Sequence, residues 1–320
     1  MVERTVRLAV VGIGNLGARF VRIVAETAPR LLERWSLVLQ VVAVADRGGC
    51  AVDPGGLDAG AIIRAKREGR SVASLPCGGR PGQSALEMIR EESFDVLCEA
   101  TPVRWEHGAE PGLSHVRAAL SRGRHVVTPN KGPITRAGGE LIRLAAAHGA
   151  QLRYDGTVAG GLPVLYTGTR DLRGAEIRCI EAVPNLSTGV VLDLLGDGVP
   201  WDEAVDAARQ QGALEEDPDW DLEGWDAAAK LVILARAVQG ADVAMDDVDR
   251  RGIRDVSAAD VIAAQREGER VRLVATSEAT GDSFRLRVAP SRIDRDHPLA
   301  GLGSNGMGIV FTTDLYGVIS

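Results

Sequence analysis

The chain has 320 residues, of which 45% are hydrophobic and 25% charged, a mixture that is typical of a globular protein and excludes a disordered one. This length is enough for two domains that each bury a core. The formal net charge of -7 argues against nucleic acid or an anionic membrane as a partner and favours small molecules.

Cysteine and histidine usage gives no sign of a metal centre. The four cysteines lack Cys-x-x-Cys spacing, which argues against a zinc site and a disulfide framework. The five histidines show no metal-ligand spacing either; His107 and His115 are expected at polar loop or helix-edge positions without a chemical role. No signal sequence and no bilayer-spanning apolar run is recognisable, so the expected compartment is the cytoplasm.

The first predicted strand, residues 6–11, runs into a Gly-x-Gly-x-x-Gly loop, and a helix is predicted at residues 18–32. Gly12 permits the tight turn, Gly14 lets the backbone approach a pyrophosphate, and Gly17 lets the helix pack close to the sheet. The start of the helix, with Asn15 and Leu16, directs unpaired N–H groups and a partial positive charge towards the phosphates. The loop therefore predicts a dinucleotide site.

The second strand, predicted at residues 38–45, is followed by Asp46 and Arg47. Asp46 can accept hydrogen bonds from ribose hydroxyls, which favours NAD, whereas Arg47 can pair with a 2′-phosphate, which favours NADP. A solvated strand end is the alternative for both residues. The pair therefore indicates a nicotinamide dinucleotide and leaves the choice between NAD and NADP open.

Residues 47–83, rich in Gly, Pro and Arg, are predicted to form a surface excursion with one helix near residues 58–68. Further strands are predicted at residues 94–100 and 125–128. Buried strands separated by helices are typical of a parallel sheet with crossover helices. We therefore expect a Rossmann-type, dinucleotide-binding α/β domain over residues 1–150.

Longer helical patterns, at residues 201–211 and 225–239, follow in the second half of the chain. They precede alternating strand patterns at residues 270–277 and 283–289. These helical and alternating strand patterns predict an α+β domain over residues 151–320 whose sheet is mostly antiparallel.

Four short segments resemble the homoserine dehydrogenase family when they are taken together with the glycine loop. They are Thr-Pro-Asn-Lys at 128–131, a glycine-rich turn at 154–163, Glu-Glu-Asp-Pro at 215–218 and Asp-x-x-Gly-x-Asp-x-x-x-Lys at 221–230. The resemblance covers nearly the whole chain and is closest to the short form, without an aspartate kinase or a C-terminal regulatory domain. It implies interconversion of homoserine and aspartate 4-semialdehyde with NAD or NADP, in threonine and methionine biosynthesis.

The resemblance also implies catalytic roles. The reaction needs a group that takes the hydroxyl proton as hydride leaves, and Lys131 and Lys230 are the candidates. Lys131 is expected to end a strand at the carboxyl edge of the parallel sheet, where ligands bind. Asp226, four residues before Lys230 on one helix, would position the substrate or a lysine. Taken without the resemblance, this pair would be an ordinary solvated ion pair.

Substrate and cofactor residues follow from the same resemblance. Glu215 and Asp221 correspond to substrate-binding acids, with Glu216 and Asp217 as alternatives to Glu215. The remaining assignments are Thr157 and Gly161 near the substrate, Thr101 beside the cofactor ribose, and Asp155, Val158 and Gly160 as ligands of a monovalent cation. A plain interdomain turn and a strand-end turn are the alternatives.

Two departures from the family pattern keep other functions open. The family's Asn-Gly-Thr-Thr-Asn-like stretch is replaced at residues 185–189, which permits a related dehydrogenase of another small amino or hydroxy acid. The chain also stops before a helix that family members pack on the dinucleotide domain, which permits a non-catalytic dinucleotide sensor. A homodimer through the second domain's sheet is expected from the resemblance and from an apolar outer face over residues 183–195.

Overall fold

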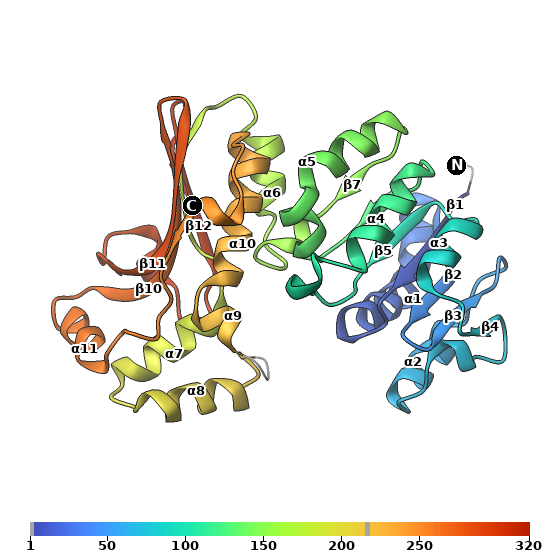
Figure 1. Ribbon diagram of the computed structural model, residues 1–320, viewed down its shortest axis with the longest axis horizontal. Coiled ribbons are helices and arrows are strands. Elements are labelled where there is room, and N and C mark those ends of the chain that lie inside the picture. Colours follow the sequence, from blue (N-terminus) through green and yellow to red (C-terminus); the bar gives the residue numbers. More distant parts are fainter. Residues whose placement is uncertain (1–2, 215–217) are drawn as a thin grey trace. The chain divides into compact units, whose positions relative to one another are not determined.

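The computed structural model describes residues 3–214 and 218–320 (Figure 1). The chain divides into two compact units, Met1–Thr157 and Val158–Ser320, and each is described by itself. In neither described stretch is there a helix with the length and apolar character that a membrane crossing requires.

The first unit contains a seven-stranded sheet in the order β4-β3-β2-β1-β5-β6-β7. Its central strand β1 pairs in parallel with β2 and β5, and the series continues in parallel through β6 and β7. The strands span β1 Arg4–Val11, β2 Leu37–Asp46, β3 Gly49–Val52, β4 Gly79–Pro81, β5 Val96–Glu99, β6 His125–Val127 and β7 Leu152–Arg153. The predicted parallel sheet is thus confirmed.

Within residues 47–83 the helix predicted near residues 58–68 is confirmed, but the interpretation of the rest as a surface excursion is wrong. β3 pairs antiparallel with β2 and with β4, so this segment extends the sheet by two strands. All four residues of β3 are buried. A turn of only two residues, Arg47 and Gly48, joins β2 to β3, and such a hairpin returns the chain onto the edge of the sheet.

Five helices accompany the first sheet: α1 Asn15–Trp35, α2 Ala59–Arg67, α3 Ala85–Glu91, α4 Gly112–Ser121 and α5 Lys131–Ala147. The buried residues of α1 are Gly17, Val21 and Val24, whose spacing of four and three places them on one helix face. Val21 and Val24 pack in one core with residues of β1 and β2. This packing fixes the start of α1 next to the end of β1.

The second unit has a six-stranded sheet in the order β13-β12-β8-β10-β11-β9. Only the β11–β9 pair is parallel, so the prediction of a mostly antiparallel sheet is confirmed. The strands span β8 Ile177–Val183, β9 Val248–Arg250, β10 Arg270–Thr280, β11 Ser283–Ile293, β12 Gly308–Thr313 and β13 Gly317–Ile319.

The helices of the second unit are α6 Val164–Tyr166, α7 Leu186–Gly196, α8 Trp201–Gln210, α9 Asp219–Leu222, α10 Trp225–Leu234 and α11 Ala258–Arg266. Of these, α7, α10 and α11 contact the sheet, while α8 and α9 pack against α7 (Figure 1). Helix α10 buries Ala227, Ala228, Ala229 and Leu231–Leu234, so it is apolar around most of its circumference and lies in the core.

The expected apolar outer sheet face over residues 183–195 does not exist. Val183 ends β8, and the following residues form α7. Val190, Val191 and Leu192 of α7 are buried in the core of their own unit. The apolar character of this segment therefore serves internal packing and gives no support to a dimer interface.

Candidate active site

Two glycines of the dinucleotide loop are required by packing. Gly12 has a φ of 89°, and a Cβ there would lie 2.5 Å from the carbonyl carbon of Ala100 and 2.6 Å from the amide nitrogen of Thr101. A Cβ at Gly17 would lie 2.1 Å from the carbonyl oxygen of Gly12. Both neighbours are backbone atoms and cannot move aside, so only glycine fits at these positions.

Gly14 differs from the other two glycines because a Cβ there would meet nothing within 4 Å. It is the N-cap of α1 and offers no side-chain acceptor to the first N–H groups of the helix. Unpaired N–H groups beside open space form the kind of site that binds phosphate. Asn15 opens the helix, and Leu16 is 64% exposed next to it.

Asp46 ends β2 in a polar network of its own. Its Oδ1 accepts hydrogen bonds from Ser71 Oγ at 2.6 Å and from the amide of Gly48 at 2.9 Å. Its Oδ2 accepts from Lys66 Nζ at 2.7 Å and from the amide of Val72 at 3.1 Å. Burial tends to raise the pKa of Asp46, but these bonds outweigh burial and lower the pKa below its ordinary value.

Arg47, in contrast, is exposed beside this network. Its guanidinium therefore belongs to the solvent-facing surface after β2. Both residues thus lie at the carboxyl end of β2, as the sequence predicted, but Asp46 is already surrounded by protein donors.

Thr101 and Lys131 follow neighbouring parallel strands at the carboxyl edge of the first sheet. Thr101 lies in the loop after β5, whose last residue is Glu99. The prediction that Lys131 ends a strand is wrong, because β6 stops at Val127 and Lys131 is the first residue of α5. Asn130 caps this helix by accepting a hydrogen bond at 3.0 Å from the amide of Gly132.

His107 is exposed, as predicted, whereas His115 is not at the polar surface position expected for it. His115 lies within α4 and is 4% exposed. Its Nδ1 is 3.7 Å from the carboxylate of Glu99, a fully buried residue. Neither Glu99 nor His115 was identified as a site residue from the sequence, because only the fold brings them together.

A second polar cluster lies in the second unit, where Asn185 joins two carboxylates. Its Nδ2 donates to Asp221 Oδ1 at 2.8 Å and to Asp226 Oδ2 at 2.9 Å. Asp221 belongs to α9 and Asp226 to α10, and Gly224 between these helices has a φ of 79°. The left-handed glycine lets one helix end and the next begin within two residues, which brings the two acids together.

Lys230 completes this cluster, which we call the Asn185 cluster: Asn185, Asp221, Asp226 and Lys230. The ammonium nitrogen lies 2.8 Å from Asp226 Oδ2, 2.7 Å from the carbonyl oxygen of Pro184 and 3.1 Å from Asn185 Oδ1. An ammonium group has three N–H bonds, and acceptors at these distances hold it in a defined position. The side chains of Lys230 and Asp226 are only 13% and 16% exposed.

The charges of the Asn185 cluster do not cancel. Two carboxylates face one ammonium group, so the formal charge is negative when all three groups are ionised. Burial and the nearby charge of Asp226 raise the pKa of Asp221, although Lys230 and Asn185 oppose this shift. A cationic group that bound here would relieve the repulsion between the two acids.

Asn185 is a functional candidate that the sequence interpretation did not select. The available signal was the asparagine that opens the 185–189 stretch. Glu215 and its alternatives Glu216 and Asp217 lie outside the described residues.

The glycine-rich turn spans the division between the two units. Thr157 is buried in the first unit and donates its hydroxyl to the carbonyl oxygen of Tyr154 at 2.6 Å. Ala159 and Gly160 in the second unit have φ values of 52° and 58°, and Gly161 is exposed. Asp155 lies in the first unit and Val158, which is buried, in the second. Within the part of the chain that the structure describes, no group of three His, Cys, Asp or Glu residues is arranged for a metal ion.

Comparison with known proteins gives consistent matches over both units. Residues 12–155 match the family "Homoserine dehydrogenase, NAD binding domain", and residues 163–320 match the family "Homoserine dehydrogenase". The NAD(+)-dependent homoserine dehydrogenase of Pseudomonas canavaninivorans is 34% identical over 98% of this chain and 89% of its own length. A homoserine dehydrogenase of Methanocaldococcus jannaschii is 31% identical over 96% of this chain and 90% of its own length.

Solved structures show the same architecture. One from Archaeoglobus fulgidus superposes with a TM-score of 0.86 at 31% identity, covering 98% of this chain and 92% of its own. A hyperthermophilic archaeal homoserine dehydrogenase in complex with NADPH gives a TM-score of 0.84 at 26% identity, covering 99% of this chain and 90% of its own.

Proposed function

The chain belongs to the homoserine dehydrogenase family and is an NAD(P)-dependent homoserine dehydrogenase, and we propose that the Asn185 cluster binds its substrate while Lys131 and Lys230 handle the proton. The observation that carries this proposal is the joint hydrogen bonding of Asp221, Asp226 and Lys230 to Asn185. Burying several charged groups on the otherwise apolar helix α10 is unfavourable, and such an arrangement is typical of a site that binds a charged ligand.

The substrate's α-ammonium group is the cation that this cluster lacks. Asp221 and Asp226 supply the carboxylates, and Glu215 is proposed as a further acid. Thr157 and Gly161 of the glycine-rich turn are proposed near the rest of the substrate. Asp226 has a second task, because its contact with Lys230 holds the ammonium group of that lysine in place.

Oxidation of homoserine breaks the C–H bond of the carbinol carbon, and the hydrogen leaves with both electrons as hydride. The bound dinucleotide supplies the hydride acceptor. The hydroxyl proton passes to a lysine in its unprotonated amine form as the C=O bond forms, and the resulting ammonium group returns a proton in the reverse direction. Lys131 and Lys230 are both proposed for this transfer. To act as the base, Lys230 must give up a proton and one of its hydrogen bonds to protein acceptors, so that its lone pair can face the substrate hydroxyl.

The dinucleotide is proposed to lie on the loop and helix start formed by Gly12, Gly14, Asn15, Leu16 and Gly17. The open space at Gly14 would take the pyrophosphate. Thr101 and Lys131 are proposed to reach the part of the cofactor near the sheet edge.

The two residues at the carboxyl end of β2, Asp46 and Arg47, favour NADP over NAD as the cofactor. Asp46 already accepts four hydrogen bonds and is neutralised by Lys66, so it has little capacity left for ribose hydroxyls. Arg47 is exposed and can pair with a 2′-phosphate. Relatives of both kinds exist, since one is described as NAD(+)-dependent and another was solved with NADPH.

A monovalent cation is proposed at the glycine-rich turn, held by Asp155 and by the carbonyl groups of Val158 and Gly160. This donor set consists of oxygen atoms only, which is the set that hard cations prefer. The cation would stabilise the turn near the substrate, and no step of the reaction depends on it.

We also propose a homodimer formed through the sheet of the second domain, with residues 1–150 as the dinucleotide domain and 151–320 as the substrate and dimerisation domain. Leu315, Tyr316 and Val318 are exposed next to or on the edge strand β13, where a second copy could cover them. Sedimentation that shows a monomer at micromolar concentration would contradict the dimer.

The compartment is proposed to be the cytoplasm. The free cysteines Cys50, Cys77, Cys98 and Cys179 agree with a reducing compartment of this kind.

The experiment that tests the substrate proposal compares homoserine with 4-hydroxybutyrate, which lacks the α-ammonium group. Formation of reduced nicotinamide is followed with NAD and with NADP. Because the acids would be left without their cationic partner, we expect kcat/KM for 4-hydroxybutyrate to be lower by at least about 100-fold. Equal values for the two alcohols would mean that the Asn185 cluster does not bind the ammonium group.

A further inference from the structure

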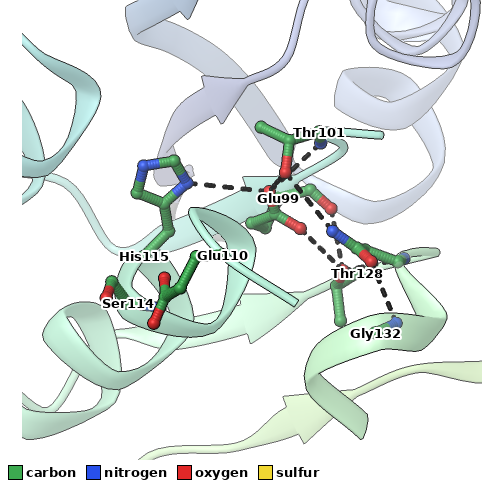
Figure 2. Close-up of polar contacts among 8 residues, drawn as sticks. Glu99, Thr101, Glu110, Ser114, His115, Thr128 and Gly132 are labelled. Atoms are coloured by element: carbon green, nitrogen blue, oxygen red, sulfur yellow. Dashed lines mark hydrogen bonds and ion pairs between the residues drawn. The ribbon is translucent and has the colours of Figure 1, made fainter. Parts of the chain in front are cut away.

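A buried carboxylate, which belongs neither to the dinucleotide loop nor to the Asn185 cluster, occupies the end of β5 beside the end of β1. Glu99 is 0% exposed and has no lysine or arginine contact among the described ion pairs. Its surroundings consist of hydroxyl and amide groups and the ring of His115 (Figure 2). Burying a carboxylate without a strong cation is unfavourable, and an apolar residue of similar volume would fill the same space more cheaply. Stability alone therefore does not account for this residue.

Glu99 connects the loops that follow two neighbouring strands. Its Oε1 accepts hydrogen bonds from both the amide, at 3.1 Å, and the hydroxyl group of Thr101 in the loop after β5. Its Oε2 lies 3.3 Å from the hydroxyl of Thr128 after β6, and that hydroxyl also donates to the carbonyl oxygen of Glu99 at 2.9 Å. A single residue therefore fixes the separation of the two loops.

The same network continues to the start of α5. The hydroxyl of Thr128 accepts a hydrogen bond at 3.0 Å from the amide of Asn130. Asn130 is 3% exposed, donates from Nδ2 to Thr101 Oγ1 at 3.3 Å, and caps α5 through Gly132. Lys131 lies between the capping residue and the capped amide, so its backbone position depends on this network.

His115 lies on the other side of the carboxylate. Its Nδ1 is buried and, within the described part of the chain, has no hydrogen-bond partner, since the 3.7 Å separation from Glu99 Oε1 is too long for one. A small movement of the carboxylate towards the ring would create that bond. The buried ring blocks any larger movement, so it limits how far Glu99 can move away from the two loops.

We propose that Glu99 is a positioning residue for the dehydrogenase reaction: it holds Thr101 and the Asn130-capped start of α5 so that Lys131 meets the reacting hydroxyl group, and His115 restrains it from behind. This inference rests on the proposed proton-transfer role of Lys131. A displacement of the reacting groups by about 1 Å can cost on the order of 100-fold in rate, so a residue without substrate contact can limit kcat.

The test compares Glu99→Leu and Glu99→Gln in the full chain. Leucine removes every acceptor, whereas glutamine keeps the shape and one acceptor oxygen for Thr101. We expect Glu99→Leu to lower kcat by about 10-fold to 100-fold, with Glu99→Gln in between, while the Kd for the dinucleotide in a fluorescence titration changes by a much smaller factor, through Thr101 and Lys131 alone. With homoserine deuterated at the carbinol carbon, the isotope effect on kcat should rise, because the chemical step is the one that slows.

The matched control is Asp95→Asn, at the opposite end of β5. Asp95 accepts hydrogen bonds from the amide and the guanidinium of Arg7, so its loss should lower stability. It lies away from the carboxyl edge of the sheet, and kcat should therefore stay close to the parental value. A folded Glu99→Leu variant with parental kcat, or a loss of kcat in Asp95→Asn of the same size, would overturn the positioning role.

A double variant separates this inference from the proposed function. If Glu99 acts through Lys131, adding Glu99→Leu to Lys131→Ala should cause almost no further loss of kcat. Multiplied losses would show that Glu99 does not act through Lys131, and the inference would be wrong. A parental kcat in Lys131→Ala alone would instead refute the proposed role of Lys131.

Discussion

Replacement of Gly14 should separate cofactor binding from folding. The backbone at Gly14 has a φ of -87° and a ψ of -155°, a conformation open to residues with a side chain, and a Cβ would meet nothing within 4 Å. The free energy of unfolding of the Gly14→Val variant should therefore lie within about 0.5 kcal/mol of the parental value, as is typical of a surface substitution. Its side chain would occupy the space proposed for the pyrophosphate, so dinucleotide affinity should fall by about 100-fold or more, equivalent to about 3 kcal/mol.

Gly12→Ala is the matched control within the same loop. A Cβ there would approach backbone atoms of Ala100 to 2.5 Å, about 0.9 Å closer than an ordinary contact, and the positive φ adds strain. We expect a loss of about 2–4 kcal/mol in the free energy of unfolding. Urea denaturation gives that energy, and nicotinamide fluorescence gives the dinucleotide Kd. Parental affinity in Gly14→Val, or parental stability in Gly12→Ala, would refute this interpretation of the loop.

Three further variants test separate parts of the site. Asn185→Ala removes the amide shared by the cluster, including the bond to Asp221; kcat/KM for homoserine should fall by about 10-fold or more with an unchanged dinucleotide Kd, and a parental kcat/KM would contradict the cluster. Asp46→Asn should lower the Tm at neutral pH. Since folding lowers the pKa of Asp46, its stabilisation exists above the ordinary pKa of about 4 and is lost below it, so the Tm difference should close as the pH falls; a difference independent of pH would exclude the charge as its cause. Arg47→Ala should raise the KM for NADP by about 10-fold and leave that for NAD nearly unchanged, whereas equal effects on both would remove Arg47 from the 2′-phosphate site.

The parts of the fold that the sequence predicted are those with strong local patterns. β1, β2, α10 and β10 were located because each carries a buried apolar run or a clear period. β3 was missed because its four residues, Gly49–Val52, follow a glycine-containing turn and are too few to show a period. Its burial comes from pairing with β2, which is not visible in the segment itself.

The site shows the same division between local and distant contacts. Asp226 and Lys230 were paired correctly because their spacing along one helix implies proximity. Asn185 and Glu99 were not identified, since Asn185 meets Asp226, and Glu99 meets Thr128, only in the folded unit. A buried polar residue of this kind looks in sequence like any other strand-end or loop residue.

Steady-state oxidation of homoserine by the double variant Lys131→Ala, Lys230→Ala tests the central claim most directly. The two lysines belong to different units, and their convergence on one substrate remains a prediction. If both serve the same proton transfer, each single variant should lower kcat by about 100-fold or more with a much smaller change in dinucleotide affinity, and the double variant should lose clearly less than the product of the two. A double variant that folds, binds the dinucleotide and keeps a near-parental kcat would contradict the claim.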